Sequence, residues 1–457
     1  MGVFNFVGGF LRRKRFRNVL LNRVPIIPQE LWFDLNGLIH KSASQIYAYG
    51  RAETKEEEQQ LEKRQEEISK LTDAELEKQF LDKIIDNIVD TINIFKPTGI
   101  VVIAIDGVAP AAKINQQRQR RYKASKFKND KIRFNSSSIT PGTDIMFKID
   151  DVIKSFIKEN YQKLPPQIIY SGHLVSGEGE AKIFDMIRRG VIGKGSAVLV
   201  GLDADLIMLS LISGVNKLYL SRENKEDIIN IDAFREQLQN ELLTGSAVED
   251  FVLMSFLIGN DFLPHQPAGE EILDFYDRMF IAYKTIRSGI INDGIIDWKS
   301  FSKFIINLSR EEEKLLEAIS AKPTKYPNQV LLSSFTLTEL PNKMSVRKFS
   351  YELFRGHWYV KALSPKGNID ILNDELKLDF GPDSDKIGKM CQDYLTTIAW
   401  NYTYYTQGTT AVNPEHLYHY NYAPLFSDLA IIMADSPGNL SEYRDFPDAI
   451  YFTPLHQ

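Results

Sequence analysis

The chain has 457 residues, of which 43% are hydrophobic and 25% are charged, a composition typical of a globular protein with a sizeable core. Its apolar runs are too short to span a bilayer, and its single cysteine, Cys391, excludes a disulfide framework or a cysteine-rich zinc site. The net charge of −5 argues against general adhesion to nucleic acid. We therefore expect a protein without a membrane span in a reducing compartment, the cytoplasm, with the nucleus as the alternative.

The first 260 residues alternate short apolar runs with helical periodicity. Four runs predict buried strands, at residues 31–35, 99–105, 167–170 and 197–202. A helical pattern follows each run, which predicts an α/β fold with a mostly parallel sheet and helices on both faces. Residues 53–80, dense in Glu, Lys, Gln and Leu, predict one long solvated helix.

The pattern changes in the second half of the chain. Residues 270–320 are helical in pattern throughout, and the last segment is rich in Tyr and His. We predict an α/β core over residues 1–265, a helical region over 266–325, and a smaller α+β segment over 326–457. The last segment is expected to pack back over the crevice of the α/β core.

Seven acidic residues follow the predicted strands or stand at turns. They are Asp34, Asp106, Glu178, Glu180, Asp203, Asp205 and Asp261. In open α/β sheets ligands bind at the carboxyl ends of the strands, so these side chains are expected to converge in one crevice. Two pairs have i, i+2 spacing, which places both carboxylates of a pair on the same side of an extended stretch.

Carboxylates gathered in one crevice repel one another, and burying them unpaired is costly. Bound divalent cations relieve both problems, and an all-oxygen ligand set favours Mg²⁺ or Mn²⁺ over zinc. We predict two such ions, which would clamp the attacking water and the leaving oxygen of a phosphodiester. For each acid taken alone, the alternative is a helix cap or a turn former.

A basic island interrupts the acidic chain. Residues 113–133 contain nine Lys or Arg and one acid. Four polar residues of this island have i, i+4, i+7 and i+8 spacing, which places them on one face of a helix just after Asp106. They are Lys113, Gln117, Arg120 and Arg121. Guanidinium groups bind phosphate oxygens bidentately, so this face is predicted to hold a terminal phosphate beside the metals; a solvated basic face is the alternative.

Several segments resemble the motifs of Xrn-type 5′→3′ exoribonucleases. FDLNGLIH at residues 33–40 resembles the family's DxNGxxH, and AIDGVAPAAKINQQR at 104–118 resembles IDGVAPxAKxNQQR almost residue for residue. Further segments resemble family motifs in the same order, at residues 139–143, 171–173, 177–180, 201–209 and 259–265. The chain is interpreted as a minimal, divergent nuclease core, with a viral source as one hypothesis.

The resemblance implies degradation of single-stranded RNA from a 5′-monophosphate end to mononucleotides, with the seven acids holding two metal ions. It also implies that the four residues of the basic face form a pocket for the 5′-monophosphate that excludes caps and triphosphates. His40 matches a histidine that stacks on a base near the 5′ end, opposite an aromatic residue. Because two tryptophans usual in the family are absent from residues 408–418, Trp400 is the first candidate for that partner, before Tyr418 or His416.

Two other functions remain open. A structure-specific flap endonuclease would use an acid-lined α/β scaffold on branched DNA, and a non-catalytic scaffold would bind RNA without the acids. The phosphate-binding face disfavours the first, and the complete set of seven acids disfavours the second. We expect a monomer whose partner is single-stranded RNA with a 5′-monophosphate, and functional coupling to a decapping enzyme is a further hypothesis.

Overall fold

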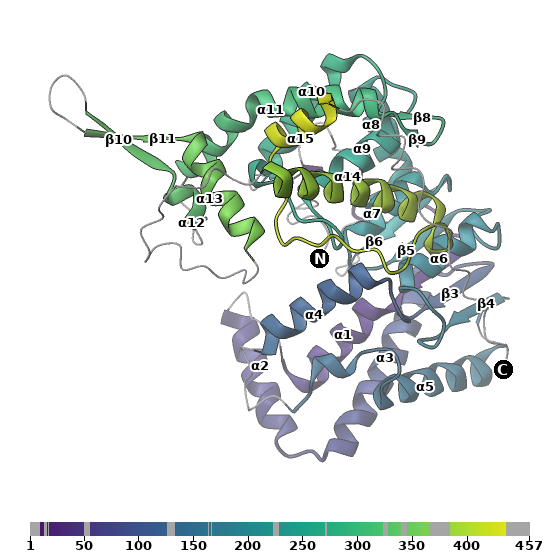
Figure 1. Cartoon of the computed structure of the whole chain (residues 1–457). Helices are drawn as coiled ribbons and strands as arrows, with labels where there is room; N and C mark the ends of the chain where they lie inside the picture. Colours follow the sequence, from purple (N-terminus) through teal and green to yellow (C-terminus); the bar gives the residue numbers. More distant parts are fainter. Residues whose placement is uncertain are drawn as a thin grey trace. The chain divides into compact units, whose positions relative to one another are not determined.

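A seven-stranded sheet organises the first part of the chain in the computed structural model (Figure 1). Its strands are β1 (Leu20–Leu21), β2 (Glu30–Asp34), β3 (Ile100–Ala104), β4 (Gln167–Ser171), β5 (Ala197–Val200), β6 (Leu218–Ser221) and β7 (Ile228–Asn230). Their order across the sheet is β1-β7-β6-β5-β2-β3-β4. Strands β2 to β6 run parallel, whereas β7 is antiparallel to both of its neighbours.

The structure describes residues 10–12, 16, 18–49, 55–125, 133–162, 164–165, 167–222, 228–269, 272–322, 328–339, 345–364 and 384–435. The chain forms two compact units, which are described separately. The sheet unit comprises Leu11–Glu236 and Thr406–Glu415; the helical unit comprises Met1–Phe10, Gln237–Tyr405 and His416–Gln457. The expected division at residues 265 and 325 stays a prediction.

Helices cover both faces of the sheet. The helical elements of this part of the chain are α1 (Leu35–Tyr47), α2 (Lys55–Ile68), α3 (Asp73–Phe95), α4 (Ala111–Ser125), the short 3₁₀ helix η3 (Ser136–Ser138), α5 (Asp144–Asn160), α6 (Gly179–Arg188), α7 (Asp205–Ile212) and α8 (Ile231–Leu242). Side chains alternate between the faces of a strand, so Leu31 and Phe33 of β2 join a core with α1, α3 and α5. Trp32 is fully buried on the opposite face, where α6 contacts β2 and β3. The predicted α/β fold is confirmed.

The single helix predicted over residues 53–80 is wrong, because α2 ends at Ile68 and α3 begins after a short turn. The hydroxyl of Thr72 accepts a hydrogen bond from the N–H of Glu75, and the Glu75 carboxylate accepts one from the N–H of Thr72. This reciprocal pair is a capping box, which starts a new helix. The new helix is not solvated throughout, since Phe80 is fully buried.

The helical unit carries most of the second half of the chain. Its elements are α9 (Ala247–Ser255), η4 (Phe256–Ile258), η5 (Pro267–Gly269), α10 (Ile272–Ile286), β8 (Ile291–Asn292), β9 (Ile295–Ile296), α11 (Trp298–Ser320), α12 (Gln329–Leu332), β10 (Phe335–Glu339), β11 (Ser345–Phe349), α13 (Tyr351–Leu363), α14 (Ser384–Gln407) and α15 (Phe426–Asp435). Strands β10 and β11 pair in an antiparallel hairpin, which confirms a smaller α+β segment. No helix among the described residues is long and apolar enough to cross a membrane.

The expectation that residues 270–320 are helical throughout is wrong at one place. Strands β8 and β9 form a short antiparallel hairpin between α10 and α11. Its two turn residues, Asp293 and Gly294, both have positive φ, as a type I′ turn requires. The Asp-Gly pair was therefore a turn signal inside an otherwise helical pattern.

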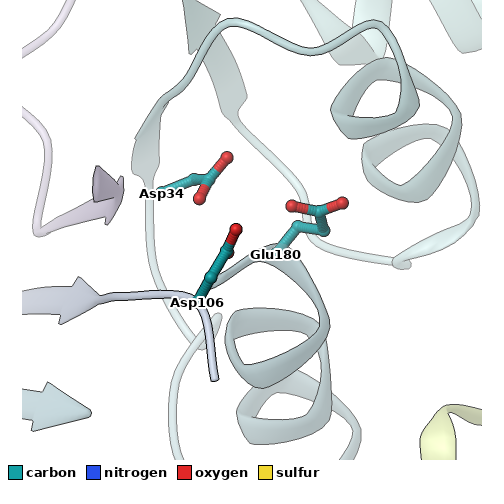
Figure 2. A group of neighbouring side chains, drawn as sticks. All are labelled: Asp34, Asp106 and Glu180. Atoms are coloured by element: carbon teal, nitrogen blue, oxygen red, sulfur yellow. The ribbon is translucent and has the colours of Figure 1, made fainter. Parts of the chain in front are cut away.

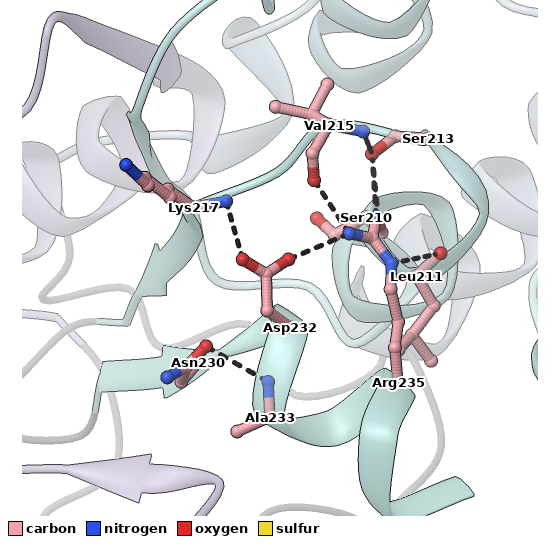
Figure 3. A network of polar contacts seen from close by, with 9 residues as sticks. All are labelled: Ser210, Leu211, Ser213, Val215, Lys217, Asn230, Asp232, Ala233 and Arg235. Carbon is pink, nitrogen blue, oxygen red and sulfur yellow. Dashed lines mark hydrogen bonds and ion pairs between the residues drawn. The ribbon is translucent and has the colours of Figure 1, made fainter. Parts of the chain in front are cut away.

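One arginine closes the carboxyl end of α7 (Figure 3). The guanidinium of Arg235 donates to the carbonyl oxygens of Ser210 (2.6 Å), Leu211 (2.7 Å) and Val215 (2.7 Å). It also donates to Asp232 Oδ1 at 3.0 Å. The last carbonyls of a helix have no partner within the helix, and a cation is favourable there. Arg235 therefore fixes α7, the helix that begins at one of the predicted acids.

We expect Arg235→Met to lower the free energy of unfolding by about 2–4 kcal/mol, because three mostly buried carbonyls lose a charged donor. Arg235→Lys should recover only part of this loss, since an ammonium cannot reproduce the planar fork. Urea unfolding measures the effect, and the exposed Arg23 supplies the control variant Arg23→Met. Equal midpoints for Arg235→Met and Arg23→Met would show that the network contributes nothing.

Candidate active site

Six of the predicted acids belong to the sheet unit and lie where its parallel strands end. Asp34 is the last residue of β2, where it pairs in register with Ala104 at the end of β3, and Asp106 follows two residues later. The remaining acids flank the starts of α6 and α7, after β4 and β5: Glu178, Glu180, Asp203 and Asp205. Because parallel strands end at the same edge, the sheet brings these residues to one side of the unit.

Three of these acids form a close group, called here the acid cluster (Figure 2). Carboxylate oxygens of Asp34, Asp106 and Glu180 all lie within 4.8 Å of one another. The three side chains point into a shared space from the end of β2, the loop after β3 and the first turn of α6. Asp34 and Glu180 are each only 7% exposed, so their charges are largely removed from water.

A glycine at the start of α6 permits this approach. A Cβ on Gly179 would lie 2.4 Å from Asp34 Oδ1, so any other residue would displace the carboxylate. The Gly179 N–H donates to Asp106 Oδ1 at 2.7 Å, and the Asp106 N–H donates to Asn36 Oδ1 at 3.0 Å. Gly179 therefore leaves room for the carboxylate of Asp34 and holds that of Asp106 by a hydrogen bond.

Burial and mutual repulsion favour the neutral forms of the acid cluster. Burial raises the pKa of Asp34 and of Glu180 well above the ordinary value, and neighbouring acids add to the shift. Burial also raises the pKa of Asp106, although the hydrogen bond from Gly179 opposes this. Within the described part of the chain, Asp34 Oδ1 is buried and has no hydrogen-bond donor. An all-oxygen group of this kind is compatible with a divalent cation, which these three residues could hold.

A buried lysine lies beside the acid cluster. Nζ of Lys113 is 2.6 Å from Glu178 Oε1, and both side chains are almost fully buried. The Lys113 ammonium lowers the pKa of each residue of the acid cluster, against the effect of burial. The residue predicted to bind phosphate is thus also an internal counter-charge for the acids.

These groups open into one pocket of about 620 Å³ in the sheet unit. Predicted site residues that line it are Asp34, His40, Asp106, Lys113, Gln117, Arg121, Glu178, Glu180 and Asp203. Carboxylates and cations predicted from separate sequence patterns therefore share one cavity. Such an arrangement can hold a phosphate at the basic wall while an adjoining bond lies near the acids.

Comparison with known proteins identifies the family of the chain. The family profile described as "XRN 5'-3' exonuclease N-terminus" matches residues 1–224. A second profile, "Xrn1 helical domain", matches residues 244–340. The chain belongs to the Xrn-type 5′→3′ exoribonuclease family.

Relatives in this family cover much of the chain. Human "5'-3' exoribonuclease 1" is 27% identical over 425 residues, 74% of this chain and 25% of that protein. The Schizosaccharomyces pombe protein of the same name is 30% identical over 49% of this chain and 21% of its own length. This Xrn-type chain thus spans a quarter or less of these relatives. Among solved structures, the catalytic core of Rad2 in complex with DNA substrate covers 91% of this chain and 95% of that chain, with a TM-score of 0.36 and 11% identity, too distant to bear on activity.

In this Xrn-type chain, α4 carries the residues predicted to bind a 5′-phosphate. Lys113, Gln117 and Arg121 line the pocket. Nη2 of Arg121 donates to Thr140 Oγ1 at 2.8 Å, which orients the guanidinium. The side chain of Arg120 lies outside the described residues.

The other predicted acids have separate positions. Asp205 is the first residue of α7 and is 5% exposed, but it does not line the pocket. Asp261 follows η4 in the helical unit, where Asn260 Oδ1 accepts from the N–H groups of Phe262 and Leu263. The metal-binding role of both acids in this Xrn-type chain stays a prediction.

The two residues predicted to stack on a base differ in their surroundings. His40 is an exposed residue of α1 that lines the pocket. Trp400 is fully buried in α14, where it stacks on Tyr404 at 5.3 Å and on His416 at 5.5 Å and meets Phe262 edge-on. Because the Trp400 side chain is fully buried among these rings, it has no ring face open to a base, and the prediction for it is wrong.

Sequence reasoning missed one wall of the pocket. Its neutral residues come from the end of α1, from the loop that follows it and from η3: Ser44, Gln45, Tyr49, Ser136 and Ser137. The Tyr49 ring stacks on Phe134 with centroids 5.9 Å apart, and burial raises the Tyr49 pKa to about 12. Its hydroxyl is buried and has no partner among the described residues. No charge or spacing marks these neutral residues as part of an Xrn-type site.

Proposed function

We propose that this chain degrades single-stranded RNA from a 5′-monophosphate end to mononucleotides. The observation that carries the proposal is the single pocket in which the acid cluster faces the basic helix α4. Names of the Xrn-type relatives, each a 5′-3′ exoribonuclease, support the same activity. A terminal phosphate held at α4 would bring the first phosphodiester near the acids.

The acids would serve as metal ligands. Asp34, Asp106 and Glu180 would hold a divalent ion, and the remaining predicted acids would complete a site for two ions of Mg²⁺ or Mn²⁺. Bound ions supply an activated water and neutralise charge on the phosphodiester. The protein's own part is to keep these carboxylates ionised and aligned, to which Lys113 and the Gly179 N–H contribute.

The basic wall would select the RNA end. Arg121 can bind two oxygens of a terminal phosphate, and Gln117 can donate one hydrogen bond. Phosphate bound there would fix the register of the strand, and a cap or triphosphate would not fit the same contacts. His40 would stack on a base near this end, with an aromatic partner other than Trp400.

We further propose that the chain acts as a monomer in the cytoplasm, or in the nucleus as the alternative. An enzyme that needs a 5′-monophosphate requires a prior reaction that exposes one. Functional coupling to a decapping enzyme would supply such ends, since capped RNA carries no free 5′-monophosphate.

The deciding experiment compares matched substrates with the purified chain. RNA with a 5′-monophosphate should be converted to mononucleotides in Mg²⁺, RNA with a 5′-hydroxyl should be degraded far more slowly, and EDTA should stop both reactions. Flap DNA is the third substrate, and its cleavage at the branch would favour an endonuclease instead. Equal rates on the two RNA ends, or internal RNA fragments as first products, would contradict the proposal.

A further inference from the structure

One buried histidine of the sheet unit has no part in the chemistry proposed above. His173 follows β4 and is 1% exposed. Its Nδ1 accepts a hydrogen bond from the N–H of Gly142 at 3.1 Å, and its ring meets Phe147 edge-on. Burial lowers the pKa of His173, which favours the neutral ring that this bond requires.

The bond from His173 holds a loop that forms part of the pocket wall, residues 139–143. Ile139 and Pro141 line the pocket. Gly142 has a φ of +85°, a conformation that glycine adopts without strain. One residue of the same loop, Thr140, accepts the hydrogen bond from Arg121 at 2.8 Å. A shift of this loop would therefore move the acceptor that orients a predicted phosphate-binding guanidinium.

The backbone beside His173 is hydrogen-bonded to a lysine of α6, the helix that carries Glu180 of the acid cluster. Nζ of Lys182 donates to the carbonyl oxygen of Gly172 at 2.9 Å and to that of Ile105 at 2.6 Å. Lys182 is a buried residue of α6, two positions after Glu180 of the acid cluster. Ile105 directly precedes Asp106. Lys182 thus links the segment that carries His173 to the two elements that carry Asp106 and Glu180.

We propose that His173 is a positioning residue that keeps the phosphate-binding wall in register with the acid cluster. This inference rests on the proposed function, because it concerns how the phosphate-binding residues and the acid cluster of that site are aligned. His173 touches neither the acids nor a phosphate; it acts through Gly142 and Thr140 on Arg121. Loss of its Nδ1 acceptor would lower the preference for 5′-phosphorylated over 5′-hydroxyl RNA and leave the acids in place.

Two substitutions at this position separate the hydrogen bond from simple core packing. His173→Leu fills the space but removes the acceptor, whereas His173→Asn places a carbonyl oxygen near the position of Nδ1. A purely structural role would be met by any residue that fills the core. A positioning role predicts that Asn rescues what Leu loses.

The test measures KM and kcat on 5′-phosphorylated and 5′-hydroxyl RNA, together with binding of both RNAs in EDTA by fluorescence anisotropy. His173→Leu should reduce the preference for the 5′-phosphate roughly fivefold to tenfold through KM and binding, as expected for one lost hydrogen bond. The Mg²⁺ concentration at half-maximal rate should stay unchanged. His173→Asn should restore the preference, and His173→Leu combined with Arg121→Ala should be less than additive.

Thr140→Val is a second route, because it removes the acceptor of Arg121 without touching the core around His173. It should reproduce the loss of preference even if His173→Leu does not fold. Equal weakening on both RNA ends in a folded His173→Leu protein, failure of Asn to rescue it, or an unchanged preference in Thr140→Val would each overturn the inference. A wild-type chain that prefers 5′-phosphorylated RNA in binding but never hydrolyses it would overturn the proposed function alone.

Discussion

Asp34→Asn is expected to slow hydrolysis strongly and at the same time to stabilise the protein when no metal is added. Burial, together with the charges of Asp106 and Asp203, raises the pKa of Asp34 well above the ordinary value. The folded state then binds the proton more tightly than the unfolded state. The free energy of unfolding therefore falls as the pH rises from the pKa of Asp34 in the unfolded chain through its pKa in the folded protein. Asparagine carries no charge at any pH, so the substitution removes this destabilisation at neutral pH.

The same substitution removes a metal ligand. Loss of one ligand should cost about 4 kcal/mol of transition-state stabilisation, which is roughly a 10³-fold lower rate. Metal at a hundred times its dissociation constant should stabilise the wild type by about 2.7 kcal/mol. In the Asp34→Asn protein this stabilisation should largely disappear, because the neutral amide would offer no charge to the ion.

Thermal unfolding with and without Mg²⁺, and single-turnover rates on 5′-phosphorylated RNA, measure both effects. For a chain of this length, each kcal/mol should shift the melting temperature by roughly 1–2 °C. Glu159→Gln, at an exposed carboxylate on α5, is the matched control and should change neither quantity. An Asp34→Asn protein that melts lower than the wild type without metal, or that turns over normally, would contradict the proposed role of the acid cluster.

Sequence patterns located the sheet and the acids because both depend on local rules. Buried parallel strands appear as short apolar runs, and the four expected runs lie within two residues of β2, β3, β4 and β5. An acid directly after such a run must emerge at the carboxyl edge, as Asp34 and Asp106 do. Strands β1, β6 and β7 were not predicted. Strands β1 and β7 have two or three residues and pair at one edge of the sheet, and β6 is a run of only four residues.

Long-range packing accounts for the errors at Trp400 and Lys113, whereas the two missed helix breaks follow from local turn and capping signals. Trp400 lies in an apolar helical pattern, in which Tyr404 is its neighbour one turn along the same helix. Only the fold brings His416 and Phe262 against its ring. The breaks after α2 and α10 depend on a capping box and a two-residue turn, which outweigh helical periodicity over a few residues. The role predicted for Lys113 from the sequence was incomplete, because its partner Glu178 is 65 positions away along the chain.

We expect Lys113→Met to destabilise the fold and to abolish activity, because Lys113 is a counter-charge as well as a predicted phosphate ligand. Its Nζ lies 2.6 Å from Glu178 Oε1, with side chains 7% and 3% exposed. Removing one partner of a buried ion pair leaves an uncompensated charge, which costs about 3–5 kcal/mol. The pKa of Asp34, of Asp106 and of Glu180 should also rise, since the Lys113 ammonium lowers each of them.

Gln117→Ala separates the two roles of Lys113. Gln117 lines the same pocket one helical turn later, and its side chain carries no charge. If Lys113 only binds phosphate, both substitutions should weaken 5′-phosphate selection and leave urea unfolding nearly unchanged. If it also neutralises the acids, only Lys113→Met should lower the unfolding midpoint, and adding Glu178→Gln should restore stability without activity. A Lys113→Met protein as stable as Gln117→Ala would show that the neighbouring acids do not depend on this ammonium for their charge balance.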